Sequence, residues 1–272
     1  MGAAAETVVV GRGSLLAREF VARHPDLVLR TLGHAEVDDA AAYAGARSVV
    51  NFAFAPGLES QPYDAALDVD RRIGAQAARL GLHYVMISSR RVYAQSAQWN
   101  AEESMPVPGI DAYGRNKARV EAVLREQLGD RLTVLRPGNV VGYEPIAGRR
   151  RFAAYLQSQL LAQGRIRLTV DAGARRDLVP AEFFCRVVRE AALQNRGGIF
   201  NVGAGRATRV GDAARWLLDG YGKGELHSEA AQPPDEFQLV CNRLSDLFGL
   251  ACEEGAVEAA LKEIGRRLAR GG

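Results

Sequence analysis

The sequence predicts an α/β protein in which a doubly wound parallel sheet, covered by helices on both faces, is followed by a smaller C-terminal lobe. The first observation is that a short apolar run, Thr7–Val10, leads directly into the turn Gly11–Ser14 and then into a pattern with apolar residues on one helical face. The second is another apolar run a few residues later, near Leu27–Leu32. The third is that strand and helix patterns keep alternating through the first half of the chain, which is typical of a parallel sheet.

Each later element is predicted in the same way, from an apolar run or from helical periodicity. In the first part we expect strands at 48–54, 84–88 and 132–135 and helices at 64–80 and 113–128, the last of them ended by Gly129. In the second part we expect helices near 152–162 and 182–192, a strand near 166–170, another helix after Gly205 and a terminal helix at 254–269. Residues 1–145 then form the sheet domain and residues 146–272 the small lobe, within one compact body whose elements can interleave.

The composition is that of an ordinary soluble globular protein, and it excludes several classes of function. The 272 residues are 47% apolar and 25% charged, with a net charge of +3 spread along the chain, so we expect no nucleic-acid surface. Without an apolar run of ~20 residues we expect no membrane span. Cys185, Cys241 and Cys252 match neither a disulfide framework nor a zinc site. The start of the chain lacks the regions of a signal peptide, and we expect a cytoplasmic protein without a metal.

Tyr113 and Lys117 point most directly to chemistry. They lie four residues apart in a predicted helix, so both side chains share one face. An ammonium in that position lowers the pKa of a phenol, which starts near ~10, and so prepares a general acid/base for neutral pH. Lys117 is one of only three lysines among the 35 Lys and Arg residues, which sets it apart from the arginine-rich background.

The turn after the first strand has the place and composition of a phosphate-binding loop. Backbone N–H groups at a helix start, together with the positive end of the helix dipole, bind a pyrophosphate. Against the pattern G-x-x-G-x-x-G, Ser14 and Ala17 replace the second and third glycines, and the Ser14 hydroxyl can donate to a phosphate. A plain tight turn is the alternative. The expected cofactor contacts here are Gly11, Arg12, Gly13, Ser14, Leu15 and Leu16.

The choice of dinucleotide is predicted from the end of the second strand, where NAD-binding proteins usually carry a carboxylate that holds the adenosine ribose. Arg30–His34 contains no carboxylate. Arg12 and His34 could instead bind a 2′-phosphate, so the sequence favours NADP(H) over NAD(H).

Ser88 and Ser89 end the strand predicted at 84–88, on the edge of the sheet where ligands bind. Two serines in such a place are commonly only the start of a loop. Because Ser89 precedes the helix that carries Tyr113, it is also a candidate to hold the reacting oxygen toward the phenol.

Together these motifs resemble the extended short-chain dehydrogenase/reductase family, of the NAD-dependent epimerase/dehydratase type that modifies nucleotide sugars. The resemblance covers residues 7 to about 215, with the motifs in the family's order and rough spacing. It implies a Rossmann-type dinucleotide-binding domain over residues 1–145 and a substrate-binding lobe over residues 146–272. The motifs are Gly11–Ala17, Ser88–Tyr93, Tyr113 with Lys117, Leu135–Gly142, Arg175–Val179 and Phe200–Gly205.

The resemblance implies a role for each matching residue. Tyr113 is the acid/base, Lys117 supports it and holds the nicotinamide ribose, and Ser89 orients the reacting carbonyl or hydroxyl. Asn139 contacts the substrate, with a purely structural turn as the alternative. Arg176 grips the substrate diphosphate, with a surface ion pair as the alternative. Further cofactor contacts are expected from Ala53, Pro137, Tyr113 and Lys117.

Departures from the family pattern reduce the number of family reactions that we expect from this chain. Family dehydratases carry an acidic pair directly after the active-site hydroxyl, whereas this chain has Arg90 and Arg91, so elimination of water is not expected. The chain is short for a family epimerase, which favours a reductase of a 4-keto sugar attached to a nucleotide. A nucleotide-sugar 4-epimerase is the alternative, and a catalytically idle sensor or scaffold that binds the cofactor is the second. We expect a small-molecule nucleotide-sugar partner and a homodimer formed through the helices at 64–80 and 113–128.

Overall fold

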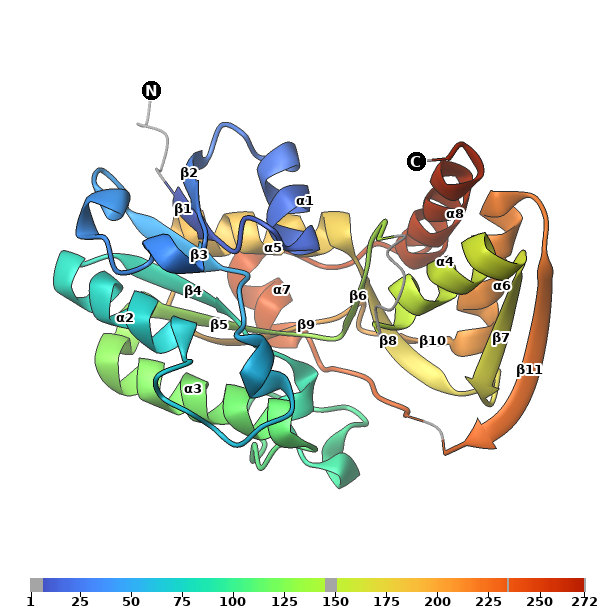
Figure 1. Ribbon diagram of the computed structural model, residues 1–272. Coiled ribbons are helices and arrows are strands. Elements are labelled where there is room, and N and C mark those ends of the chain that lie inside the picture. The colour runs from blue at the N-terminus through green and yellow to red at the C-terminus, as the bar shows by residue number, and fades with distance from the viewer. Residues whose placement is uncertain (1–6, 145–150, 234, 272) are drawn as a thin grey trace.

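The computed structural model describes residues 7–144, 151–233 and 235–271. Its centre is a six-stranded parallel sheet with the strand order β2-β1-β3-β4-β5-β9 (Figure 1). β2 lies on one side of β1 and β3 on the other, so the winding direction reverses between β1 and β3. Ligands of such sheets bind outside the carboxyl ends of the strands at this reversal. The strands are β1 (Thr7–Val10), β2 (Val28–Leu32), β3 (Ser48–Asn51), β4 (His83–Ile87), β5 (Leu132–Pro137) and β9 (Gly198–Val202).

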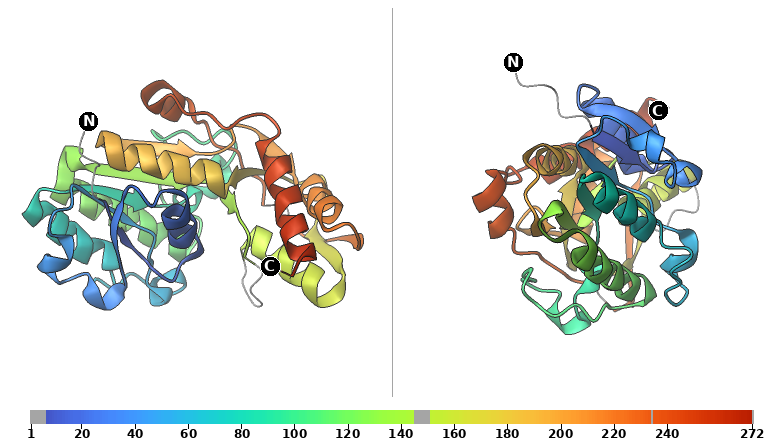
Figure 2. Two further views of the ribbon diagram at one scale, coloured as in Figure 1. Left: turned by 90° about the horizontal axis from the view of Figure 1, so that it is seen from above. Right: turned by 90° about the vertical axis from the view of Figure 1, so that its left-hand side faces the viewer.

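Helices cover both faces of this sheet (Figures 1 and 2), which confirms the predicted doubly wound α/β fold. α1 (Leu15–Arg23) and α5 (Ala181–Gln194) pack together over one face. α2 (Val69–Leu80) and α3 (Ala112–Leu128) pack together over the other.

Alternation along each strand builds the two cores. Val9 packs in the core under α1 and α5, whereas Val8 and Val10 pack in the core under α2 and α3, and all three are fully buried. A strand that is covered on both faces needs apolar residues at every position. This is why the sequence shows short continuous apolar runs.

The smaller part of the molecule is built around a core of its own (right-hand side of Figure 1). β6 pairs with β8 in parallel and β10 pairs with β8 antiparallel, while β7 and β11 form a separate parallel pair. Leu160, Leu178, Leu217 and Leu261 are buried in its core. Its elements are β6 (Asn139–Val141), α4 (Phe152–Gln163), β7 (Arg165–Val170), β8 (Arg175–Pro180), β10 (Ala207–Arg209), α6 (Val210–Tyr221), β11 (Glu225–Gln232) and α8 (Ala256–Ala269).

The central sheet and the smaller part are built from interleaved segments of the chain. α5 and β9 come after residue 145, yet α5 packs on β3 and β4, and β9 pairs with β5 as the sixth strand of the central sheet. After β11 the chain returns along the boundary, where Phe237 bridges to Arg176 and Leu239 bridges to Ala101. It then enters α7 (Asn242–Phe248), which packs on β9 and α5. The segment after residue 145 therefore contributes to both parts.

α2 begins later than the helix predicted at 64–80. Asp68 is its N-cap, because the carboxylate accepts a hydrogen bond from the backbone N–H of Arg71 at 3.0 Å. Gly81 ends the helix with a φ of 71°. This start places Asp70 in the first turn and buries it against the sheet.

Candidate active site

Tyr113 lies in the first turn of α3, beside the segment that follows β4. Asp111 caps this helix by accepting from the backbone N–H of Gly114 at 2.8 Å, and it also forms an ion pair with Arg91. Gly114 packs so closely on this segment that a Cβ atom there would overlap with the carbonyl oxygen of Arg91. The guanidinium of Arg91 lies 5.7 Å from the centre of the Tyr113 ring. The start of α3 is therefore fixed against the segment that carries Ser89.

Lys117 is buried one turn further along α3, with 2% of its surface exposed. Its Nζ donates to the carbonyl oxygen of Ile87 at 2.8 Å and lies 4.3 Å from the centre of the Phe54 ring. The same ring packs edge-on against Tyr113, with ring centres 5.0 Å apart. Ser89 follows Ile87 by two residues, is half-buried, and accepts from a backbone N–H of the next turn at 3.2 Å. The structure thus gathers the three predicted catalytic residues around the carboxyl end of β4.

A buried carboxylate lies next to Lys117. Asp70 is 2% exposed, and its Oδ2 lies 3.5 Å from the Lys117 Nζ. Its Oδ1 accepts from Asn51 Nδ2 at 2.8 Å and from the Tyr84 hydroxyl at 2.5 Å. Burial, reinforced by the Asp70 charge, raises the pKa of Tyr84 well above its usual value. Asp70 is a site residue that the sequence motifs do not include.

A second buried network fixes α3 to the sheet. Glu121 of α3 pairs with Arg136 of β5, with Oε2 and Nη2 2.6 Å apart, and each residue is 2% exposed. The Ser88 hydroxyl, at the end of β4, donates to the same carboxylate. Arg136 also donates to the Tyr93 hydroxyl at 3.0 Å. β4, β5 and α3 are therefore tied together directly behind the catalytic residues.

The turn from Gly11 to Ala17 has the geometry that a phosphate-binding loop requires. Gly11 has a φ of 99°, and a Cβ atom there would lie 2.9 Å from the backbone nitrogen of Ala53, so only glycine fits. A Cβ atom on Gly13 would have no neighbour within 4 Å, so the space over the start of α1 is open. Ser14 caps α1 by accepting from the backbone N–H of Ala17 at 3.1 Å, which leaves its own hydroxyl proton free to donate. These residues fit a dinucleotide diphosphate.

The other predicted cofactor residues lie along the same edge of the sheet. Leu15 and Leu16 open α1 and are half-buried, Ala53 follows β3, and Pro137 is the last residue of β5. Because the carboxyl ends of parallel strands meet at one edge, these positions line up with the end of β4. His34 is exposed, at the start of the short helix that follows β2.

The structure differs from the sequence expectation at the end of β2, because a carboxylate does lie there. Glu36 accepts from the backbone N–H of Gly33 at 2.7 Å and pairs with Arg12, with Oε2 and Nη2 2.7 Å apart. Arg12 also donates to the Thr31 carbonyl oxygen at 2.8 Å. The hydrogen bond from Gly33, and secondarily Arg12, hold the pKa of Glu36 below its usual value. The guanidinium expected to meet a 2′-phosphate is therefore already paired with an anion.

Asn139 and Arg176 lie on neighbouring strands of the smaller part. Asn139 opens β6 and is paired with Leu178 of β8, the strand that carries Arg176. The Arg176 side chain is 13% exposed, its Nε donates to the carbonyl oxygen of Asp235 at 3.1 Å, and its guanidinium lies 5.0 Å from the centre of the Phe152 ring. Burial lowers the pKa of Arg176. Its Nη2 also lies 4.0 Å from Oδ2 of the partly exposed Asp235, so the ion pair named as the alternative role is present and both roles for Arg176 stay open.

Arg90 turns toward the returning segment after β11. Its guanidinium donates to Gln98 and to Asp235, both at 2.7 Å, and stacks 3.6 Å from the centre of the Phe237 ring. Burial lowers the pKa of Arg90 to about 10. The position directly after Ser89 thus holds a buried cation rather than an acid.

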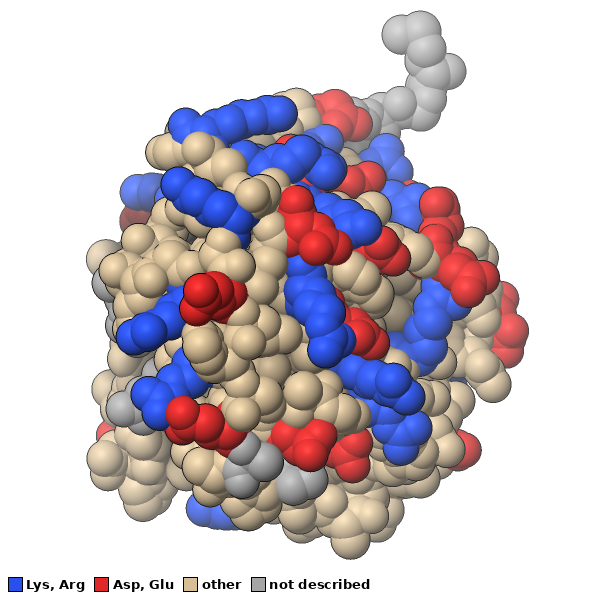
Figure 3. Space-filling model, turned by 90° about the vertical axis from the view of Figure 1, so that its right-hand side faces the viewer, with Lys and Arg blue, Asp and Glu red and all other residues tan. Residues whose placement is uncertain are grey.

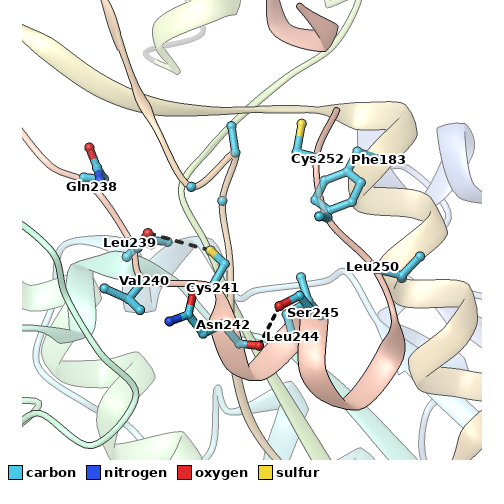
Figure 4. Close-up of a pocket in the computed structure, with 14 residues that line it drawn as sticks. Phe183, Gln238, Leu239, Val240, Cys241, Asn242, Leu244, Ser245, Leu250 and Cys252 are labelled. Atoms are coloured by element: carbon cyan, nitrogen blue, oxygen red, sulfur yellow. Dashed lines mark hydrogen bonds between the residues drawn. The ribbon is translucent and has the colours of Figure 1, made fainter. Parts of the chain in front are cut away.

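A pocket of about 360 Å³ lies apart from these residues (Figure 4). Phe183 of α5, the turn at 203–205 and the segments 238–242, 244–245 and 250–252 line it, and none of the predicted site residues does. Cys241 and Cys252 lie at its wall. Burial raises the pKa of both thiols, so neither is a ready nucleophile at neutral pH.

Other kinds of site find no support in the part of the chain that the structure describes. Within those residues, no three His, Cys, Asp or Glu side chains are grouped so that they could hold a metal ion. Nor does any helix in the described ranges combine the length and apolar character needed to span a membrane. On the face of the smaller part shown in Figure 3, basic and acidic side chains are interspersed rather than separated.

The sequence resembles a known protein family. The family model described as "NAD dependent epimerase/dehydratase family" matches residues 13–203. The sequence matches no curated protein.

Similar folds occur among solved structures. UDP-N-acetylglucosamine 4-epimerase from Methanobrevibacter ruminantium M1, in complex with UDP-N-acetylmuramic acid, is 16% identical, with a TM-score of 0.84 over 98% of this chain and 99% of that chain. UDP-glucose 4-epimerase from Thermotoga maritima, with UDP-glucose, is 16% identical, with a TM-score of 0.81 over 98% of this chain and 99% of that chain. The NAD-dependent NDP-hexosamine 5,6-dehydratase TunA is 18% identical, with a TM-score of 0.79 over 97% of this chain and 98% of that chain. At these identities the likeness shows a shared fold.

Proposed function

The chain belongs to the NAD dependent epimerase/dehydratase family, and from this we propose that it transfers hydride between a nicotinamide dinucleotide and a ring carbon of a nucleotide-linked sugar. The observation that carries the proposal is that Ser89, Tyr113 and Lys117 gather at the end of β4, on the sheet edge that also carries the Gly11–Ala17 turn. A phenol, a hydroxyl and an ammonium at that place supply the proton transfer and charge stabilisation that such a step needs. Two structures of similar fold hold UDP-linked sugars, which supports the substrate class.

Each of these residues has a distinct task in the proposed reaction. When bound, the cofactor supplies the hydride acceptor or donor. Tyr113 exchanges a proton with the reacting sugar oxygen, while the Ser89 hydroxyl donates to that oxygen and shares its developing negative charge. Of the three protons on Lys117 Nζ, one is donated to Ile87 and a second faces Asp70. The third is available to a ribose hydroxyl of the cofactor.

Two reactions fit this chemistry, and two observations favour 4-epimerisation. The apparent shortness of the chain argues for a 4-keto reductase, yet both 4-epimerase structures are covered over 99% of their length. The apparent lack of a ribose carboxylate argues for a cofactor that exchanges at every turnover, yet Glu36 provides such a carboxylate. We therefore propose a nucleotide-sugar 4-epimerase and keep 4-keto reduction as the second candidate.

The same carboxylate bears on the choice of cofactor. Glu36 lies just past the end of β2, where an acidic side chain can accept from the ribose hydroxyls of NAD. A 2′-phosphate would have to displace Glu36 from Arg12 and would meet its negative charge. We therefore propose that the cofactor is NAD(H), in place of the NADP(H) that the sequence favours through Arg12 and His34.

Cofactor retention separates the two reactions. The purified protein is denatured, and the released nucleotide is identified by chromatography; an undenatured sample is mixed with UDP-glucose or UDP-N-acetylglucosamine and the configuration at C4 is followed by NMR. An epimerase retains about one NAD(H) per chain and interconverts the sugars without added cofactor, because it oxidises and re-reduces the same carbon. A reductase is isolated without bound NAD(H), and it consumes reduced cofactor when given the 4-keto product of a dTDP-glucose 4,6-dehydratase.

Tyr113→Phe tests the catalytic assignment, because it removes only the phenol oxygen. We expect the rate to fall about 10²–10⁴-fold, the usual contribution of a general acid/base, while cofactor content stays as in wild type. Tyr221→Phe, on α6, is the matched control and should keep full activity. If wild type catalyses neither reaction and still binds the cofactor, the idle sensor or scaffold replaces this proposal.

We also propose that the chain forms a homodimer through the outer faces of α2 and α3. A two-fold interface places the same surface of both subunits in contact, so the net charge of these helix faces determines whether the contact is repulsive. Most of their exposed charges are positive, which makes the contact repulsive at low ionic strength. The exposed arginines on these helices are Arg71, Arg79, Arg115, Arg119 and Arg125.

A further inference from the structure

We propose that Asp70 is a positioning residue for Lys117, whose carboxylate holds the ammonium beside the end of β4 and keeps it charged for the cofactor ribose. The inference rests on the proposed function, in which Lys117 contacts that ribose. Asp70 lies outside every motif from which the site was predicted. Its role follows from its contacts.

The Asp70 carboxylate is fixed from three elements. It sits in the first turn of α2, where the positive end of the helix dipole favours an anion. Its Oδ1 accepts from Asn51 at the end of β3 and from Tyr84 in β4, at 2.8 and 2.5 Å. These two hydrogen bonds prevent the carboxylate from rotating, so Oδ2 remains turned toward Lys117.

The pair is buried, which makes its charge balance important. The side chains of Lys117 and Asp70 are 3% and 2% exposed. A buried ammonium without an opposite charge is costly, and the Ile87 carbonyl oxygen supplies only a dipole. Asp70 supplies the full negative charge at 3.5 Å from Nζ.

The other titratable groups around Lys117 are less suited to this task. Asp68, the N-cap of α2, also attracts Lys117, but its carboxylate oxygens already accept from the backbone N–H of Arg71 and from the Tyr63 hydroxyl. Glu121, one turn along α3, is already paired with Arg136. Tyr113 lies one turn before Lys117 and Tyr84 lies in β4, and both are phenols.

Asp70→Asn tests the proposal because it keeps the shape and removes the charge. The affinity for NADH is measured by fluorescence titration from neutral to alkaline pH, after any cofactor that copurifies has been exchanged for NADH. Without the carboxylate the ammonium loses its proton more readily. We therefore expect the pH at which NADH affinity falls to drop by about one unit, a tenfold change in the proton equilibrium. The pH profile of turnover should move in the same direction.

Two further variants separate charge from structure. Tyr84→Phe removes a hydrogen bond from the same carboxylate but leaves its charge, so the alkaline midpoint should stay as in wild type. Asp70→Glu keeps the charge but displaces it by one methylene. The alkaline midpoint of Asp70→Glu should also stay as in wild type. Its affinity for NADH at neutral pH should fall severalfold, because the longer side chain displaces Lys117.

The outcomes distinguish this inference from the proposed function. If Asp70→Asn shares the alkaline midpoint of wild type while Lys117→Met binds NADH weakly, the role of Asp70 is overturned and the role of Lys117 stands. If Lys117→Met binds NADH as wild type does, the role of Lys117 itself is lost. Wild-type affinity in Asp70→Glu contradicts the claim that the carboxylate sets the position of Lys117, even if Asp70→Asn does not fold.

Discussion

Replacing His83 by glutamine is expected to change how the protein responds to acid. His83 opens β4, is 4% exposed, and has its Nε2 2.7 Å from the Thr133 hydroxyl oxygen. Thr133 already donates its own proton to the carbonyl oxygen of Arg196 at 2.6 Å, so it accepts from Nε2, which therefore carries a proton. Burial lowers the pKa of His83 from 6.5 to about 4.

The size of the effect follows from this shift. Between pH 6.5 and 4 the unfolded chain binds a proton that the folded chain does not, so stability falls as the pH drops through this window. Each unit of pKa difference is worth about 1.4 kcal/mol. From pH 8 to pH 5, this one residue should therefore remove roughly 2 kcal/mol from the free energy of unfolding.

The two pH values are those compared above. At each of them, wild type and His83→Gln are unfolded with urea, and circular dichroism monitors the unfolding. Asp177 changes the pH dependence of stability in the opposite direction. Burial raises its pKa to about 6, although the backbone N–H groups of Ala204 and Leu239 favour its charged form. The folded chain therefore binds a proton there more readily than the unfolded chain does. The contribution of His83 is therefore taken as the difference between wild type and variant. His227→Gln, at an exposed histidine, should follow wild type. Parallel losses in wild type and His83→Gln would refute the reasoning.

Two more predictions concern the cofactor and the assembly. Glu36→Gln should release Arg12 and raise the affinity for NADPH relative to NADH about tenfold, the usual size of one charge-assisted contact; an unchanged ratio from fluorescence titration with both cofactors would exclude Glu36 as the discriminating group. Sedimentation velocity at low and high ionic strength should show a dimer that strengthens with salt, because salt screens the arginines of α2 and α3. A protein that stays monomeric at every concentration and ionic strength would rule out the α2/α3 interface.

The elements of the sheet half were predictable because their signals are local. Thr7–Val10 and the helix that carries Tyr113 and Lys117 appear close to their predicted positions, since each depends on the periodicity of its own residues. β11 was not predicted, because Glu225–Gln232 is mixed in character and becomes a strand only by pairing with β7. The sheet position of β9 depends in the same way on β5, a distant segment.

The site was predictable to the same extent and for the same reason. Tyr113 and Lys117 are one helical turn apart, so their proximity can be read from spacing. Glu36 meets Arg12 across the end of β2, and no local pattern links the two. Asp70 stands in an acidic and basic run that is typical of a solvent-facing helix start, and its burial depends on how α2 is set against Tyr84 of β4.

The geometry of the site also depends on Gly114, because this position has no Cβ atom. Because even a methyl group there would overlap with the Arg91 carbonyl oxygen, α3 can approach the segment after β4 only with glycine at this position. Any larger residue would push Tyr113 away from Ser89 while leaving every polar site residue in the sequence unchanged. An intact set of serine, tyrosine and lysine is therefore not enough to infer activity in a related chain. The non-polar position between them has to be checked as well.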